Sequence, residues 1–289
     1  MKRCPGCTCG YISMDWVCPA CGFVISHAEG FALLAPKLAL KGPGFQPEAY
    51  AELAMLEAGN FWFRARNQLI VWAMQRHFPS VLRYLEIGCG TGFVLAGVAN
   101  AYPQARVTGS EIFSAGLPYA LERLPSAELL QMDARHIPYE DEFDMVGAFD
   151  VLEHIEEDEK VLGEIKRALH PAGGIVLTVP QHPRLWSRQD EYACHVRRYK
   201  VGELREKVER AGFHVVFETS FVSLLLPAMV VSRLTNKQKV VGNEMAELRL
   251  PKLLNSAFES IMTVERLFIR RGMRFPFGGS NLLVAKKTG

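Results

Sequence analysis

The chain lacks an apolar run long enough to cross a membrane. The longest such run, residues 221–231, is well short of the ~20 residues that a spanning helix needs. Residues 1–7 also lack the apolar stretch of a signal peptide. We therefore expect a cytoplasmic protein, in which any membrane contact is peripheral.

The chain also lacks an excess of either charge. It has 33 Lys and Arg against 31 Asp and Glu among 289 residues, a net charge of +2. Overall electrostatics therefore do not favour nucleic acid or an anionic membrane, and such a partner would need a local basic patch. Hydrophobic residues make up 49% of the chain, which is typical of a folded globular protein.

Cysteine is scarce, but four of the seven cysteines form two C-x-x-C pairs near the N-terminus: Cys4, Cys7, Cys18 and Cys21. In a reducing compartment this pattern favours a metal over disulfides, and four thiolates suit a structural zinc ion. Cys9 could replace Cys7 as a ligand. So small a module has little core of its own, so metal binding would drive its folding.

Four sections follow one another along the chain: a zinc ribbon at 1–26, a proline- and glycine-rich connector at 27–47, a main domain at 48–220 plus 280–289, and a helical cap inserted at 221–279. The main domain alternates short apolar runs with amphipathic segments. Strands are predicted at 83–87, 106–110, 127–131, 143–149, 175–179, 213–218 and 281–286, and helices at 92–101, 157–169 and 202–211. This alternation predicts an α/β fold with a parallel sheet covered on both faces.

The first predicted strand runs into a glycine-rich turn that begins with Glu86 and contains Gly88, Gly90 and Gly92. Glycines let a backbone pass close to a ligand. Glu111 follows ~20 residues later at the end of the next strand, where an acidic side chain can hold ribose hydroxyls. Dinucleotide-binding loops have a third glycine where this chain has Phe93, which argues against NAD.

The E-x-G-x-G-x-G pattern resembles the first motif of class I S-adenosylmethionine-dependent methyltransferases. Residues 109–112, 131–134, 143–155 and 169–174 resemble later motifs of that family in order, and the resemblance covers 80–220 and 280–287. It implies a three-layer α/β sandwich with a mixed seven-stranded sheet and S-adenosylmethionine as cofactor. It also implies cofactor contacts from Arg66, Glu86, Gly88, Gly90, Gly92, Glu111, Ile112, Asp133 (to the adenine amino group), Ala134 and Asp150.

Two histidines are candidate catalytic residues. His195 begins an H-x-R-R-Y element after the fifth strand, and loops at the carboxyl ends of parallel strands face the ligand. An imidazole suits proton abstraction near neutral pH, so His195 is the candidate general base, although it could simply hold the loop in place. His154 belongs to the segment that resembles the acceptor-facing loop.

Three functions remain open. The apolar cap favours methyl transfer to an oxygen or nitrogen of a small or lipid-linked acceptor, with peripheral membrane contact or homodimerisation through the cap. The second is an RNA methyltransferase that docks RNA through its zinc ribbon. The third is a non-catalytic scaffold that binds the cofactor and recruits partners.

Overall fold

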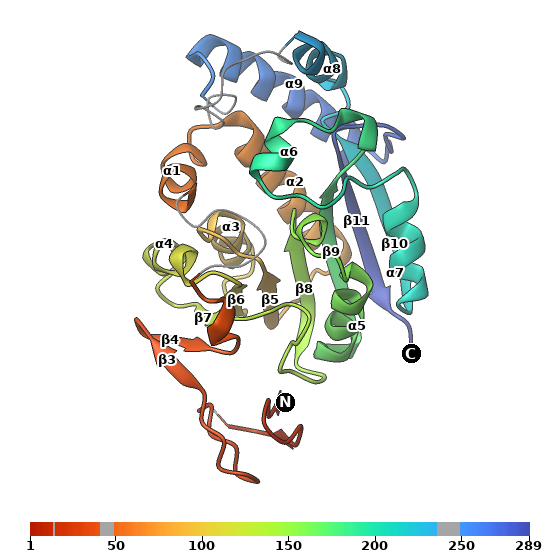
Figure 1. Ribbon diagram of the computed structural model, residues 1–289. Helices are drawn as coiled ribbons and strands as arrows, with labels where there is room; N and C mark the ends of the chain where they lie inside the picture. The colour runs from red at the N-terminus through yellow and green to blue at the C-terminus, as the bar shows by residue number, and fades with distance from the viewer. Residues whose placement is uncertain (14, 41–48, 236–248) are drawn as a thin grey trace.

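The computed structural model describes residues 1–13, 15–40, 49–235 and 249–289. Its centre is a mixed sheet with helices on both faces (Figure 1). In spatial order the strands are β10 (Phe213–Phe221), β11 (Ser280–Lys287), β9 (Leu169–Pro180), β8 (Phe143–Phe149), β5 (Arg83–Ile87), β6 (Arg106–Glu111), β7 (Glu128–Gln131), β4 (Phe31–Leu33) and β3 (Ser26–Ala28).

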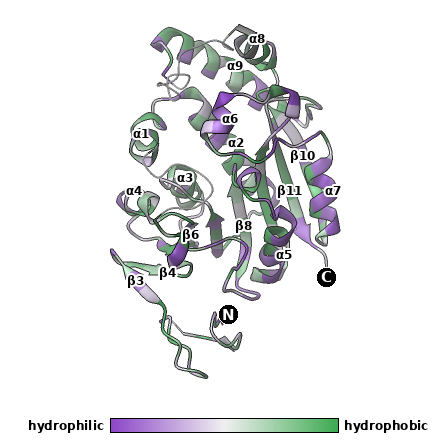
Figure 2. Cartoon of the chain, viewed as in Figure 1, coloured by the Kyte–Doolittle hydropathy of each residue, from purple (hydrophilic) through white to green (hydrophobic). Residues whose placement is uncertain are grey.

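The middle strands are parallel, and the two strands beyond β9 are antiparallel to their neighbours. Residues of β5 and β8 are almost entirely buried, as expected for strands covered on both faces. Figure 2 shows β8 as mostly hydrophobic, whereas α7 (Glu203–Arg210) at the surface is mostly hydrophilic. The predicted α/β class is therefore confirmed.

Each face of the sheet has its own hydrophobic core. The helices α2 (Phe61–His77), α3 (Phe93–Ala101) and α4 (Leu117–Arg123) pack on one face. The helices α5 (Asp158–Ala168) and α7 (Glu203–Arg210) pack on the other. The carboxyl ends of β5, β6, β8 and β9 are left open between these layers.

The sheet is larger than predicted: among the described residues it has nine strands, not seven. The additional pair, β3 and β4, lies where the sequence predicts the start of a connector. The apolar segment of β4 pairs in parallel with β7, whose outer edge would otherwise leave its backbone groups unpaired. The buried side chain of Gln131 adds hydrogen bonds to the backbone N–H and carbonyl of Ala35, each 2.9 Å long.

The N-terminal module precedes this hairpin and includes the short strands β1 (Lys2–Arg3) and β2 (Gly10–Tyr11). It contacts the main domain through Trp16, whose ring packs edge-on against Tyr139 at 5.7 Å between centroids. The backbone N–H of Arg3 also donates to the carbonyl of Pro138.

The inserted segment contains α8 (Leu226–Thr235) and α9 (Lys252–Arg270), while residues 236–248 of the predicted cap lie outside the described residues. Helix α9 packs across α2, where Arg64 forms a two-point ion pair with Glu259. Together with α1 (Ala49–Leu56), these helices surround the open end of the sheet (Figure 1). Within the described ranges, no helix has the length and apolar character needed to cross a bilayer.

Candidate active site

A cavity of about 1560 Å³ lies at the carboxyl ends of the parallel strands. The glycine-rich turn and the ends of β5 and β6 line one part of it, and side chains of the inserted helices line another. Its polar walls come from the main domain, and its apolar walls include Leu225, Met229, Leu254 and Phe258. Sites for drug-sized ligands measure roughly 300–1,000 Å³, so this cavity has room for two ligands side by side.

The glycine-rich turn has a backbone that requires glycine. Gly88 has φ +65°, and a Cβ there would lie 2.5 Å from a methyl carbon of Val151. Gly92 has φ +76° and begins α3, and a Cβ there would lie 2.8 Å from the Cα of Ala120. The turn also contacts the segment that follows helix α1, because the buried Thr91 hydroxyl donates to Glu57 at 2.6 Å. The sequence does not reveal that last contact.

Glu111 ends β6 with its carboxylate against the turn. It accepts from the backbone N–H groups of Gly90 at 2.9 Å and Ile112 at 2.8 Å. Burial raises the pKa of Glu111, and these hydrogen bonds partly oppose the rise. The carboxylate thus lies beside the glycine-rich turn at the end of a parallel strand, the position expected for a ribose-binding carboxylate.

Glu86 lies at the floor of the cavity and is 2% exposed. It accepts a hydrogen bond of 3.0 Å from the hydroxyl of Tyr84. Burial raises the pKa of Glu86 to about 8, against the pull of Tyr84 and of the nearby cation Arg66. The buried carboxyl would ionise more readily if a cationic ligand entered the cavity.

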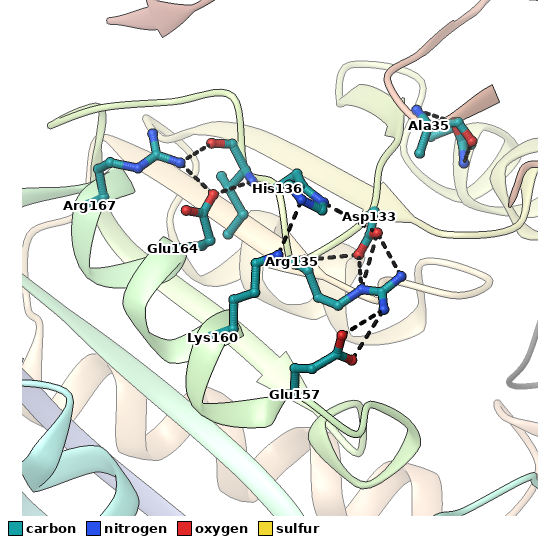
Figure 3. Close-up of polar contacts among 10 residues, drawn as sticks. Ala35, Asp133, Arg135, His136, Glu157, Lys160, Glu164 and Arg167 are labelled. Atoms are coloured by element: carbon teal, nitrogen blue, oxygen red, sulfur yellow. Dashed lines mark hydrogen bonds and ion pairs between the residues drawn. The ribbon is translucent and has the colours of Figure 1, made fainter. Parts of the chain in front are cut away.

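Asp133 follows β7 and lies in a charged network at the rim (Figure 3). Both of its oxygens accept from the guanidinium of Arg135, which also reaches Glu157 at 3.2 Å. Burial alone would raise the pKa of Asp133, but these contacts outweigh it and lower the pKa. The neighbouring Ala134 lines the cavity, so both residues are at its wall.

Two expected cofactor residues contact each other. The Nε atom of Arg66 lies 2.8 Å from a carboxylate oxygen of Asp150, and its Nη2 donates to the carbonyl of Phe149. The guanidinium also lies over the ring of Trp62, 4.8 Å from the centroid. Asp150 has φ +58°, a left-handed backbone that is rare outside glycine and recurs at functional sites.

The two candidate catalytic histidines lie together, with ring centroids 4.7 Å apart. They meet the buried side chain of Glu153, whose Oε1 is 3.9 Å from Nε2 of His195. Burial lowers the pKa of His154 to about 3, with a further contribution from His195, so its ring is neutral. Burial and the neighbouring Asp150 raise the pKa of Glu153 well above its usual value.

Sequence reasoning missed Asp190, the carboxylate that orients His195. Its Oδ1 lies 2.9 Å from Nδ1 of His195 and accepts from Nε of Arg198 at 2.7 Å. Burial would raise the pKa of Asp190, but hydrogen bonds from His195 and Arg198 hold it well below the usual range. Because Asp190 is ionised, Nδ1 of His195 carries a proton, and Nε2 is left to face the cavity. The signal was present as an acidic residue five positions before the histidine.

The four predicted metal-binding cysteines also come together, far from the cavity. The sulfur atoms of Cys4, Cys7, Cys18 and Cys21 all lie within 4.8 Å of one another. The Cys4–Cys21 and Cys7–Cys18 sulfur pairs are 3.6 Å apart. Zinc–sulfur bonds of about 2.3 Å in a tetrahedron separate the sulfurs by about 3.8 Å, so this set fits zinc. Cys9 is exposed and outside the cluster.

The chain is similar to known methyltransferases. Residues 85–177 match a family model described as a methyltransferase domain. A protein of Mycolicibacterium smegmatis, named a probable S-adenosylmethionine-dependent methyltransferase, is 28% identical over 162 residues, covering 54% of this chain and 60% of the relative. A trans-aconitate 2-methyltransferase of Variovorax paradoxus is 30% identical over 105 residues, covering 36% of this chain and 40% of the relative. The chain thus spans less than two thirds of either relative.

Solved structures share the fold. Phosphoethanolamine N-methyltransferase 2 of Haemonchus contortus, in complex with S-adenosyl-L-methionine, aligns with a TM-score of 0.53 at 20% identity, covering 77% of this chain and 53% of that one. A chain of the Haloferax volcanii complex between the Trm112 methyltransferase activator and a methyltransferase aligns at 0.56 and 17% identity, covering 84% and 97%. Residues 85–177 thus match a methyltransferase domain, and the chain shares its fold with solved methyltransferases.

Proposed function

We propose that the protein transfers the methyl group of S-adenosylmethionine to a small acceptor, free or lipid-linked, that has an apolar body. One observation carries this proposal. A single cavity of about 1560 Å³ is lined both by the glycine-rich turn with its two buried glutamates and by the cluster of Glu153, His154 and His195. The turn and its glutamates suit a cofactor. The cluster that contains the two histidines suits the reacting end of an acceptor.

In this proposal the cofactor lies across the carboxyl ends of β5, β6 and β7. Glu111 accepts from the ribose hydroxyls, and Asp133 accepts from the adenine amino group beside Ile112 and Ala134. Glu86 and the Arg66–Asp150 pair hold the charged methionine end. The sulfonium makes the methyl carbon electrophilic, so the protein mainly has to align the acceptor with it.

The acceptor would occupy the part of the cavity that faces the inserted helices. Side chains of Leu225, Met229, Leu254 and Phe258 form an apolar wall there. The similarity to a trans-aconitate methyltransferase supports a small-molecule acceptor. His154 and His195 are the polar groups that would meet its reacting atom.

The proposal is tested first by calorimetry of S-adenosylmethionine binding to the full chain. Glu111→Ala removes the carboxylate that would hold the ribose, and we expect its affinity to fall at least tenfold. Glu122→Ala is the matched control, because Glu122 is an exposed glutamate on α4 outside the cavity. Equal affinity of the wild type and Glu111→Ala for S-adenosylmethionine would contradict the proposed cofactor-binding site.

Activity is then measured as transfer of labelled methyl to candidate acceptors. Small carboxylic acids, a lipid extract and total RNA are offered in parallel to wild type and to Glu111→Ala. We expect transfer into the first or second fraction that is lost in the variant. Transfer into RNA alone would replace this proposal with an RNA methyltransferase.

We also propose that Cys4, Cys7, Cys18 and Cys21 bind a structural zinc ion. The support is the close grouping of the four sulfur atoms. Among the described residues of the module, the hydrophobic cluster consists of Cys4, Tyr11 and Cys18, which is too small to fold unaided. Its role would be to hold the hairpin of β3 and β4 on the edge of the sheet.

A further inference from the structure

Glu153, His154 and His195 form a cluster that the binding of cofactor alone does not explain. Each offers a donor atom, and these atoms lie within 4.8 Å of one another. Glu153 and His154 belong to the short turn after β8, whereas His195 follows α6 (Arg188–Tyr192). Two loops that are separate in sequence therefore bring three metal-ligating side chains to one wall of the cavity.

The cluster has unsatisfied buried atoms. Glu153 is 0% exposed, and neither of its carboxylate oxygens has a hydrogen-bond partner among the described residues. Nδ1 of His154 is buried and equally without a partner there. Buried polar atoms in native proteins are nearly always paired, and buried charges are paired or coordinate metals. These orphaned atoms therefore point to a ligand that the chain itself does not supply.

The arrangement behind the cluster also suits a cation. A metal-ligating histidine commonly donates its other ring N–H to a carboxylate, which fixes the ring. His195 meets this condition, with Nδ1 on Asp190 at 2.9 Å and Nε2 toward Glu153 at 3.9 Å. Metal bonds of about 2.1 Å put ligand atoms about 3 to 3.5 Å apart, so shifts of about an ångström would close the set.

We propose that Glu153, His154 and His195 bind one divalent cation, whose open positions face the cavity and take an oxygen of the methyl acceptor. Two imidazoles and one carboxylate are a donor set for divalent first-row metals with positions left for substrate. The acceptor would then be a hydroxyl or carboxylate compound. This last part rests on the proposed methyl transfer, whereas the cation site does not.

The cation would prepare the acceptor by lowering the pKa of its bound hydroxyl. The hydroxyl proton leaves to solvent, and a lone pair of the resulting oxygen attacks the methyl carbon of the cofactor. The O–C bond forms as the C–S bond breaks, and the sulfur keeps that electron pair as a neutral thioether. In this scheme His195 is a metal ligand and not the general base that the sequence suggests.

The test measures binding of Mn²⁺ to the full, zinc-loaded chain. Binding is detected by electron paramagnetic resonance, because the signal of free Mn²⁺ disappears when the ion binds. Mn²⁺ is the probe because hard cations avoid thiolate sites such as the N-terminal cluster. We expect one saturable site per chain in the wild type. Glu153→Gln and His195→Gln should each weaken binding at least tenfold, because each removes one ligand while nearly conserving its volume.

Four controls make the result decisive. His214→Gln changes an exposed histidine on β10 and should leave Mn²⁺ binding unchanged. Cys4→Ser should also leave it unchanged, which separates the two sites. S-adenosylhomocysteine binding is measured on every variant, so a failed cofactor site is distinguished from a failed cation site. Thermal melting shows which variants fold. If Glu153→Gln does not fold, His195→Gln alone tests the cation site.

The proposal is overturned if the wild type has no saturable Mn²⁺ site, or if both folded ligand variants bind Mn²⁺ as tightly as wild type. Activity gives a second readout once an acceptor is known. Added Mn²⁺ should then stimulate chelator-treated wild type but not His195→Gln.

Discussion

Glu86 shows how burial can link a single side chain to pH. Its folded pKa of about 8 lies above the usual value of 4.5 because the carboxyl is buried. The folded protein therefore holds a proton that the unfolded chain releases between these two values. The native-state stability from this group is fully present below pH 4.5 and is lost as pH rises through about 8.

We predict that Glu86→Gln removes this dependence. The stability of the variant relative to wild type should grow between pH 5 and 8, by up to about 1.4 kcal/mol per pH unit. Urea unfolding at pH 5.5, 7 and 8.5 measures this. A constant difference between the two proteins across that range would show that Glu86 does not titrate there.

Cofactor affinity should rise with pH, whereas the stability contributed by Glu86 falls. A cationic ligand requires ionised Glu86, so wild-type affinity for S-adenosylmethionine should increase with pH and level off above about 8. The neutral glutamine should bind more weakly and with a flatter pH profile. Calorimetry of both proteins over pH 6–9 measures these affinities. Parallel pH profiles would show that Glu86 does not contact the cofactor.

At the scale of elements, helix α9 binds the first residues of the inserted segment through the side chain of Glu265. This carboxylate is 1% exposed and accepts from the backbone N–H groups of Val222 at 2.7 Å, Ser223 at 2.7 Å and Leu224 at 2.8 Å. Val222 itself has φ +58°, an unfavourable backbone for a β-branched residue. The hydrogen bonds to Glu265 thus stabilise the strained turn from which α8 begins.

We predict that Glu265→Ala destabilises the protein by about 3 kcal/mol, because three backbone N–H groups, one of them buried, lose their acceptor. Glu259→Ala is the matched control on the same helix. It removes a partly exposed ion pair with Arg64 and should cost at most about 1 kcal/mol. Urea unfolding of the two variants gives the comparison. Similar losses would mean that Glu265 contributes no more than a surface pair.

The edge strand β4 depends on Gln131, which is 0% exposed. Its side chain bonds Ala35 twice and donates to the carbonyl of Ile112 at 2.8 Å. We predict that Gln131→Leu keeps the volume but loosens this edge. Amide exchange should accelerate at least tenfold at residues 33–38 and stay unchanged in β5. Unchanged exchange at 33–38 would show that the strand pairing alone holds the edge.

At the scale of the whole molecule, the N-terminal module and the main domain have different sources of stability. The main domain has two extensive cores, one on each face of the sheet. The described part of the module has three residues in its own cluster and a contact through Trp16. Removal of the proposed zinc ion should therefore unfold the module without unfolding the main domain.

We predict that a zinc chelator exposes Trp16, which is 7% exposed in the folded protein. Tryptophan fluorescence should shift to longer wavelength, and limited proteolysis should cleave within residues 1–26 while the main thermal transition persists. Trp16→Phe identifies the source of the signal, because the shift should disappear in that variant. Loss of the main transition on chelation would show that the two parts fold as one unit.

The sequence by itself determined the α/β class, the turn after β5 and the grouping of the four cysteines. These follow from local patterns: apolar strands of the right length, glycines that a tight turn requires, and paired cysteines at a fixed spacing. Predicted strands 83–87 and 143–149 coincide with β5 and β8, whose residues are almost all buried. The place of Glu111 beside the turn was also predictable, since it ends the strand that follows the glycine-rich segment.

Only the tertiary structure decided what depends on contacts between distant segments. The pairing of β4 with β7 requires an open sheet edge. The sequence of residues 31–33 does not indicate that these residues will pair there. The meeting of His195 with Glu153 and His154 depends on how two loops close over the sheet. The same is true of Asp190, which reads as an ordinary helix-start acid. A sequence pattern specifies which side chains are present, but burial and partners set what each carboxylate or imidazole can do.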